Sequence, residues 1–142
     1  MFKLIIRKPK KRRAGALPKG IKPYSEEELK DLAKKAKAYI PGRVSFYAEK
    51  IGVTYNRIFI KHQKSKWGSC STKGNLNFNC LLMLMPEDVI DSVVVHELCH
   101  LKQMNHSKAF YEEVYRVFPR YKECYKWLKE NGPAIMLRNR IE

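Results

Sequence analysis

The sequence predicts an α+β domain in which a small antiparallel sheet packs on one central helix, with further helices flanking it. Two changes of hydrophobic period carry this prediction. Apolar residues recur every three to four positions in residues 29–40, alternate with polar ones in residues 56–80, and return to helical spacing after Pro86. The length of 142 residues suits one such domain.

Composition excludes several classes of protein. An apolar content of 44% supports a folded core, and no apolar run approaches the ~18 residues of a membrane-spanning helix. Lys3 interrupts the apolar residues at the N-terminus, so no export signal develops. The four cysteines show no C-x-x-C spacing. We therefore expect a cytoplasmic protein with free thiols and no membrane partner.

The charge is strongly positive and uneven. Lysine and arginine total 29 against 14 acidic residues, a formal net charge of +15, and residues 1–22 hold nine basic residues and no acidic one. We predict a basic flexible arm over residues 1–22 and a single folded domain over residues 23–142. Such an arm either associates with nucleic acid or is a solvated leader, and the sequence leaves both open.

The first half of the domain contains helices followed by strands. Ser25 and Glu28 form a capping box that begins a helix, which Pro41-Gly42 should end. A second helix is expected over residues 44–51. Strands are then expected at about 58–61, 67–71 and 76–80, with a turn at 72–74 between the last two. All three strands should form the antiparallel sheet.

The second half is predicted to be helical. Pro86 begins a helix expected over residues 86–104. Its apolar residues gather on the side of His96, whereas Asp91 and Ser92 fall on a side expected to be polar. Further helices should cover residues 107–118 and 120–130, the last one ending at Asn131-Gly132.

Three of the four histidines lie within eleven residues of the central helix and its exit. His96 and His100 are four apart, so both project from one face of a helix and can share a metal ion. Glu97 lies about 100° around from His96, where it can flank the ion as a general base without binding it. A carboxylate on the core side also calls for a compensating cation. The rival interpretation is a pair of core histidines satisfied by hydrogen bonds.

The third ligand has more than one candidate. His106 follows His100 by six residues, the spacing of the last two histidines in H-E-x-x-H-x-x-G-x-x-H metal sites, although Gln103 stands where those sites have glycine. Glu112 and Glu113 are the rivals. Three protein ligands with one open position are typical of catalytic zinc, so Zn²⁺ is the expected cofactor.

These motifs together resemble the YgjP-like metallopeptidase domain, which is related to the WLM and SprT-like zinc proteases. The resemblance covers about residues 58–132. It rests on the segments Lys64–Ser71, Gly74–Asn79, Val94–Leu101, Asn105–Ser107 with Phe110, and Tyr121–Gly132. It implies a zincin-like fold for residues 23–142, zinc held by His96, His100 and His106, and Glu97 as catalyst. Relatives often begin with a longer β-rich segment, where this chain has the basic arm.

The resemblance also indicates a place for substrate. In zincins the strand beside the cleft can pair with an extended peptide. By similarity this role falls to residues 66–71, with Lys66, Trp67, Gly68 and Ser69 as expected contacts. Trp67 could instead be a core residue.

The sequence thus favours a zinc-dependent metallohydrolase, a metallopeptidase acting on a peptide or protein substrate. The first alternative is a metal-dependent nucleoside triphosphate hydrolase (pyrophosphatase), which the positive charge favours and the lack of a G-x-x-x-x-G-K-[ST] loop disfavours. The second is a nucleic-acid-associated module with a vestigial metal site.

Overall fold

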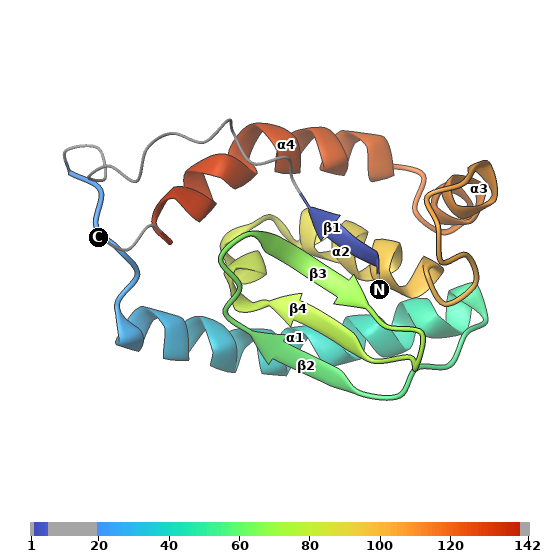
Figure 1. The fold of residues 1–142 in the computed structure, drawn as a ribbon, viewed down its shortest axis with the longest axis horizontal. Helices are drawn as coiled ribbons and strands as arrows, with labels where there is room; N and C mark the ends of the chain where they lie inside the picture. The colour runs from blue at the N-terminus through green and yellow to red at the C-terminus, as the bar shows by residue number, and fades with distance from the viewer. Residues whose placement is uncertain (1, 6–19, 140–142) are drawn as a thin grey trace.

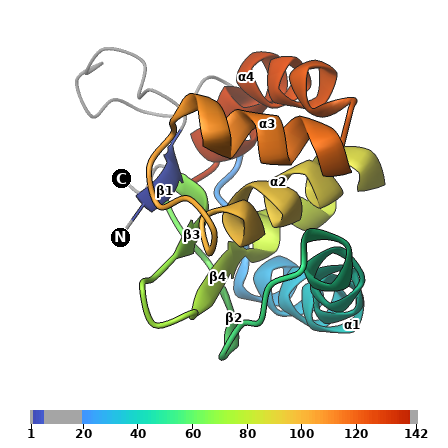
Figure 2. The same cartoon turned by 90° about the vertical axis from the view of Figure 1, so that its right-hand side faces the viewer.

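The computed structural model describes residues 2–5 and 20–139 and confirms the α+β class. A four-stranded sheet forms one layer, and helices form the other (Figure 1). Helix α2 (Glu87–Cys99) lies in the middle of the helical layer, between α1 (Glu26–Ile51) and α4 (Tyr121–Leu137), as Figure 2 shows. The central helix of the prediction is therefore flanked on two sides by helices and covered by the sheet on a third.

The sheet is mixed, which corrects the expectation of a purely antiparallel one. Its strand order is β1 (Phe2–Ile5), β3 (Lys66–Cys70), β4 (Leu76–Asn79), β2 (Ile58–Lys61). Strands β3 and β4 form the expected antiparallel hairpin, and Gly74 in its turn has a φ of 82°. Strand β2, however, pairs with β4 in parallel. Alternation along a strand predicts its faces and not its neighbour, so this pairing had no signal in the sequence.

The first strand corrects part of the predicted arm. Phe2–Ile5 pairs antiparallel with β3, with Phe2 opposite Cys70 and Leu4 opposite Gly68. A strand here supplies hydrogen-bonding partners to the edge of β3 that faces away from β4. Residues 6–19 of the predicted arm lie outside the described part of the chain, so its flexibility and its nucleic-acid association stay predictions.

Helix α1 is one helix and not two. The predicted capping box is present, since Glu28 N donates to Ser25 Oγ at 3.1 Å and Ser25 N donates to Glu28 Oε1 at 3.4 Å. The expected stop at Pro41-Gly42 is wrong, because the buried stripe continues through Ile40 and Val44 on either side of it. Packing of this stripe outweighs the hydrogen bond that proline removes.

The other helices differ from prediction mainly at their ends. After the 3₁₀ helix η1 (Cys80–Leu84), α2 ends at Cys99, five residues early. Helix α3 (Lys108–Val117) begins after Ser107, whose hydroxyl accepts from Phe110 N at 3.3 Å. Helix α4 runs seven residues beyond the predicted end at Glu130 because Ile135 and Met136 pack against the core.

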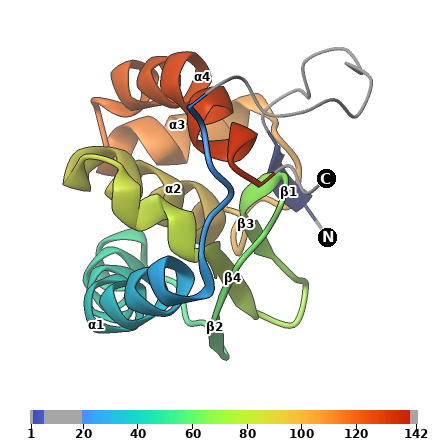
Figure 3. The same ribbon diagram turned by 90° about the vertical axis from the view of Figure 1, so that its left-hand side faces the viewer.

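The end of α4 returns to the beginning of α1. Figure 3 shows the segment before α1 running along this end of the helical layer. Tyr24 donates its hydroxyl to Ile135 O at 2.8 Å, and Arg138 donates to Lys22 O at 2.8 Å and to Glu28 at 3.0 Å. These contacts hold the two ends of the described domain together.

Helix α2 is buried around its whole circumference from Val89 to Cys99. The prediction that Asp91 and Ser92 lie on a polar side of this helix is therefore wrong, since both are buried and Asp91 is only 7% exposed. Asp91 accepts hydrogen bonds from Tyr39 at 3.0 Å, Arg43 at 2.9 Å and Tyr47 at 3.1 Å, all on α1. These three donors offset the cost of burying the carboxylate.

None of the helices in the described ranges is long and apolar enough to cross a membrane.

The buried cluster around Asp91 predicts a large loss of stability on its removal. Asp91→Ala leaves the Arg43 guanidinium without its carboxylate partner, and we expect the free energy of unfolding to fall by about 2–3 kcal/mol. Asp31→Ala is the control, since Asp31 pairs with Lys35 on the exposed surface of α1, the helix that carries Arg43, and its loss should cost at most about 0.5 kcal/mol. Urea unfolding of both variants measures the difference, and equal losses would contradict the interpretation of this cluster.

Candidate metal centre

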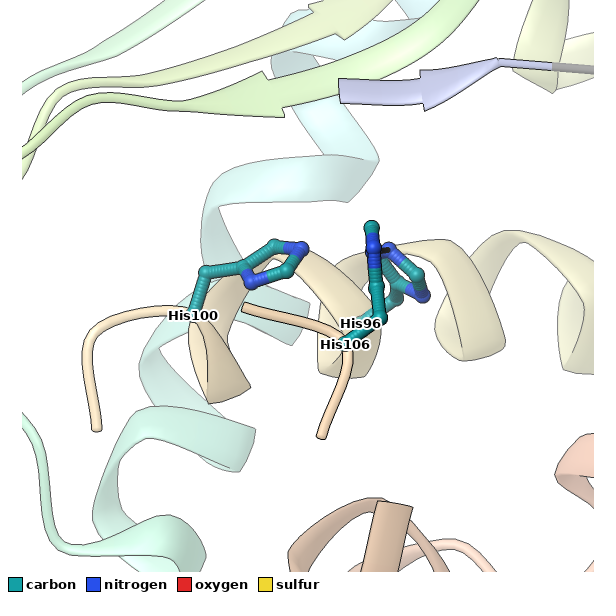
Figure 4. A group of neighbouring side chains, drawn as sticks. All are labelled: His96, His100 and His106. Carbon is teal, nitrogen blue, oxygen red and sulfur yellow. Dashed lines mark hydrogen bonds between the residues drawn. The ribbon is translucent and has the colours of Figure 1, made fainter. Parts of the chain in front are cut away.

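Three histidine side chains converge at the end of α2. His96 lies on that helix, His100 caps the end of the helix one turn later, and His106 lies in the segment that leads to α3 (Figure 4). One ring nitrogen from each lies within 4.8 Å of the others, a grouping that could hold a metal ion. The structure thus brings together all three histidines that the sequence predicted.

The turns that follow α2 bring His106 back beside the helix. His100 N donates to Glu97 O at 3.2 Å, Leu101 N to Leu98 O at 3.0 Å, and Lys102 N to Cys99 O at 3.1 Å. These i to i−3 bonds tighten the last turn, after which the chain reverses. An early end of α2 is therefore what allows His106 to face His96.

Phe110 is a part of the site whose role the sequence did not predict. It lies in the first turn of α3 and is fully buried. Its ring centroid lies 5.0 Å from that of His96, 4.5 Å from that of His100 and 5.2 Å from that of His106. One aromatic ring therefore packs against all three imidazoles and restricts how they can turn.

Nitrogen geometry fits a tetrahedral ion. Nε2 of His96 lies 3.2 Å from Nε2 of His106. Two nitrogens at roughly 2.0–2.1 Å from one tetrahedral ion are about 3.3 Å apart. His96 Nδ1 lies 2.8 Å from the Tyr121 hydroxyl, and His100 Nδ1 donates to Gln103 O at 3.1 Å. His96 and His100 thus both have their Nδ1 atoms in hydrogen bonds, which suits ligation through Nε2.

The imidazoles are neutral near pH 7. Burial lowers the pKa of His96 well below its ordinary value, and the neighbouring His100 and His106 lower it further. Burial also lowers the pKa of His100 to about 4, and it lowers the pKa of His106. A metal binds the neutral form of histidine, so no proton has to be displaced from these rings on binding.

Glu97 is the most unusual polar group of the site. It is 0% exposed, and neither of its carboxylate oxygens has a hydrogen-bond partner among the described residues. Burial raises its pKa well above the ordinary value. A carboxylate so placed is costly without a nearby cation, so Glu97 and the three neutral imidazoles together suit a bound divalent metal.

Gly68 of β3 lies directly against Glu97. A β-carbon at position 68 would lie 3.1 Å from Glu97 Cγ, 3.1 Å from Glu97 Oε2 and 3.2 Å from Asn77 O. These contacts are tighter than ordinary van der Waals contact, so glycine permits the approach of strand to carboxylate. This role had no signal in the sequence, because residues 68 and 97 are distant in the chain.

The expected substrate strand is partly corrected. Trp67 is fully buried and Ser69 is 3% exposed, so both side chains pack inside the protein. For Trp67 this agrees with the alternative of a core residue. The backbone edge of β3 pairs with β1, with Leu4 opposite Gly68 and Ile5 opposite Lys66. Substrate contact by the half-buried Lys66 stays a prediction.

The rival third ligands lie elsewhere. Glu113 accepts from Lys102 at 3.2 Å and from Arg116, and these partners lower the pKa of its carboxyl. Glu112 is largely exposed and lies 3.9 Å from Lys108. In the described part of the chain, the three histidines alone form a group with metal-ligand spacing.

Comparisons with solved structures agree with the fold. The chain resembles the metallopeptidase zymogen abylysin of Pyrococcus abyssi with a TM-score of 0.58 and 24% identity, over 64% of this chain and 93% of that one. It resembles the metallopeptidase zymogen jannalysin of Methanocaldococcus jannaschii equally, with a TM-score of 0.58 and 23% identity, over 65% and 95%. At these identities the likeness concerns the fold.

A curated relative is the UTP pyrophosphatase of Escherichia coli (strain K12), 32% identical over 77 residues. The matched segment is 53% of this chain and 46% of that protein, so the chain matches less than half of the relative's length. The model of the YgjP-like metallopeptidase domain matches residues 4–131, which reaches further toward the N-terminus than the motifs of residues 58–132. With nearly the whole chain matched, this protein belongs to the YgjP-like metallopeptidase domain family.

Proposed function

We propose that this protein is a zinc-dependent peptidase that hydrolyses peptide bonds with Glu97 as general base. The observation that carries the proposal is the Glu97 carboxylate, fully buried and without a hydrogen-bond partner among the described residues, beside three converging imidazoles. A metal site that only stabilises the fold does not require a buried, unpaired carboxylate, whereas a hydrolytic site needs a proton acceptor next to the metal.

Zinc is the metal that this donor set suits best. Three imidazole nitrogens with neutral rings are borderline-soft donors, which zinc accepts in tetrahedral geometry. His96, His100 and His106 would hold the ion and leave one position open for water or substrate. When bound, zinc supplies a Lewis acid that acidifies water and polarises the bond to be cleaved.

The chain's own residues then move the protons. Glu97 accepts a proton from the attacking water and returns it to the leaving amine. Burial raises the pKa of Glu97 and so favours its protonated form, whereas a cation in the site would favour the carboxylate, the form that can accept a proton. Gly68 leaves room for the carboxylate, because a β-carbon at that position would lie only 3.1 Å from Glu97 Oε2.

Hydrolysis of a nucleoside triphosphate is the second candidate. The relative named UTP pyrophosphatase favours it, and so does a net charge of +15 that attracts phosphates. The same proton acceptor and the same Lewis acid serve attack on a phosphoryl group. The family of metallopeptidase domains and the two archaeal metallopeptidase zymogens with the same fold support the peptidase instead.

The discriminating experiment uses Glu97→Gln. The variant retains the size of the side chain but cannot accept a proton, so we expect hydrolysis to fall by roughly 10²–10⁴-fold with zinc still bound. Wild type and variant are assayed on a peptide library and on UTP, each with and without a chelator. Chelator-sensitive cleavage of peptides alone supports the peptidase, and cleavage of UTP alone supports the alternative.

Two outcomes of this experiment would contradict the proposed mechanism. Full hydrolysis by Glu97→Gln with zinc bound would exclude Glu97 as the base. Loss of zinc from the variant would make Glu97 part of the ligand set, and the catalytic proposal would fail.

The third ligand is tested separately. We expect His106→Ala to weaken zinc binding by more than the roughly 10–100-fold that loss of an outer-shell partner costs. Glu112→Ala is the control, because Glu112 lies on the nearby α3 surface beside Lys108. Zinc affinity is measured by competition with a chelator of known affinity. Unchanged affinity in His106→Ala would return Glu112 and Glu113 to consideration.

The glycine beside Glu97 gives a further prediction. Gly68→Ala should displace the carboxylate by a few tenths of an ångström, since the added carbon would stand 3.1 Å from it. We expect activity to fall by about 10–100-fold with zinc affinity unchanged. Gly42→Ala in α1 is the control, because a β-carbon there meets nothing within 4 Å. Equal activity of the two variants would show that the close approach is not needed.

A further inference from the structure

We infer that Tyr121 is a positioning residue for the metal centre: its hydroxyl holds the His96 imidazole with Nε2 toward the metal. This inference rests on the proposed metal site and adds to it a residue that comes from a different helix. Tyr121 is the first residue of α4 and lies 25 positions from His96 in the sequence. Neither the H-E-x-x-H motif nor the third histidine points to it.

The contact is short and buried. The Tyr121 hydroxyl lies 2.8 Å from His96 Nδ1, and the two rings stack with an interplanar angle of 21°. Tyr121 is 4% exposed and His96 is 2% exposed, so water has little access to either partner. Because Nδ1 and Nε2 lie on opposite sides of an imidazole, holding Nδ1 in this direction aims Nε2 at His106.

His96 and His100 are held in chemically different ways. His100 donates Nδ1–H to the Gln103 carbonyl, which can only accept, so its tautomer is fixed. A phenol can both donate and accept, so Tyr121 satisfies His96 in either tautomer. With a metal on Nε2, Nδ1 must carry the hydrogen, and the Tyr121 oxygen then accepts it. The hydroxyl therefore pairs the ring both before and after metal binding.

Tyr121 is itself fixed by its neighbours. Its ring centroid lies 6.4 Å from that of Tyr111, 6.0 Å from that of Tyr115 and 6.1 Å from that of Tyr125. The ring is thus anchored by packing that does not depend on its hydroxyl, which makes removal of the hydroxyl alone an informative change.

The test is zinc affinity of Tyr121→Phe. The variant retains the packed ring but leaves Nδ1–H of His96 buried without an acceptor, and loss of such an outer-shell partner typically costs 10–100-fold in metal affinity. We expect the zinc dissociation constant to rise by that factor. Tyr125→Phe is the control, because it removes a hydroxyl from the same cluster of tyrosines but at a side chain that is 45% exposed. It should leave the zinc dissociation constant unchanged.

A spectroscopic readout separates positioning from a general loosening of the fold. In the zinc-loaded wild type, the His96 imidazole should show a slowly exchanging Nδ1–H resonance and a metallated Nε2 in nitrogen-15 NMR. In Tyr121→Phe the proton should exchange faster or disappear, while the resonances of His100 stay as in the wild type.

Several results would overturn the inference. Tyr121→Phe with wild-type zinc affinity and an unchanged His96 proton resonance would do so. Zinc on Nδ1 of His96 in the wild type would also do so, and that measurement needs no variant to fold. Absence of zinc binding by the wild type is a separate outcome, which contradicts the proposed function itself.

Discussion

The position of α2 in the middle of the core is the constraint on which the rest of this structure depends. A helix buried around its whole circumference has no water for its polar side chains, so each one needs a partner from a neighbouring element. Helix α1 supplies three donors for Asp91, α4 supplies the phenol for His96, and the turn after α2 supplies a carbonyl for His100. Glu97 is the exception, since its carboxylate has no hydrogen-bond partner among the described residues, and the proposed function uses it as the general base.

This arrangement also explains which parts of the site the sequence could predict. His96, Glu97 and His100 have positions fixed by the period of one helix, and His106 follows closely, so their spacing was sufficient. Tyr121 and Gly68 act through contacts between distant segments, and no local pattern encodes such contacts. The same reason applies to the fold. Local signals predicted the capping box at Ser25 and the β3–β4 hairpin, whereas the parallel partner of β2 and the continuity of α1 across Pro41 depend on tertiary packing.

Strand β1 changes how substrate access must be considered. The sequence predicted that β3 would offer an edge to an extended substrate, and in this chain that edge of β3 is paired with Phe2–Ile5. An extended peptide would therefore have to pair with the outer edge of β1, or β1 would first have to separate from β3. A nucleotide needs no strand edge, so the two candidate substrates make different demands on the first residues of the chain.

The closeness of the three histidines in the sequence has a thermodynamic consequence. They span eleven residues, so an unfolded chain can still wrap them around one ion, although without the packing of Phe110 or the hydroxyl of Tyr121. Metal that binds the unfolded state as well as the native one stabilises the fold by less than its native affinity alone would give. Thermal shifts on adding metal would therefore understate how tightly the folded centre holds it.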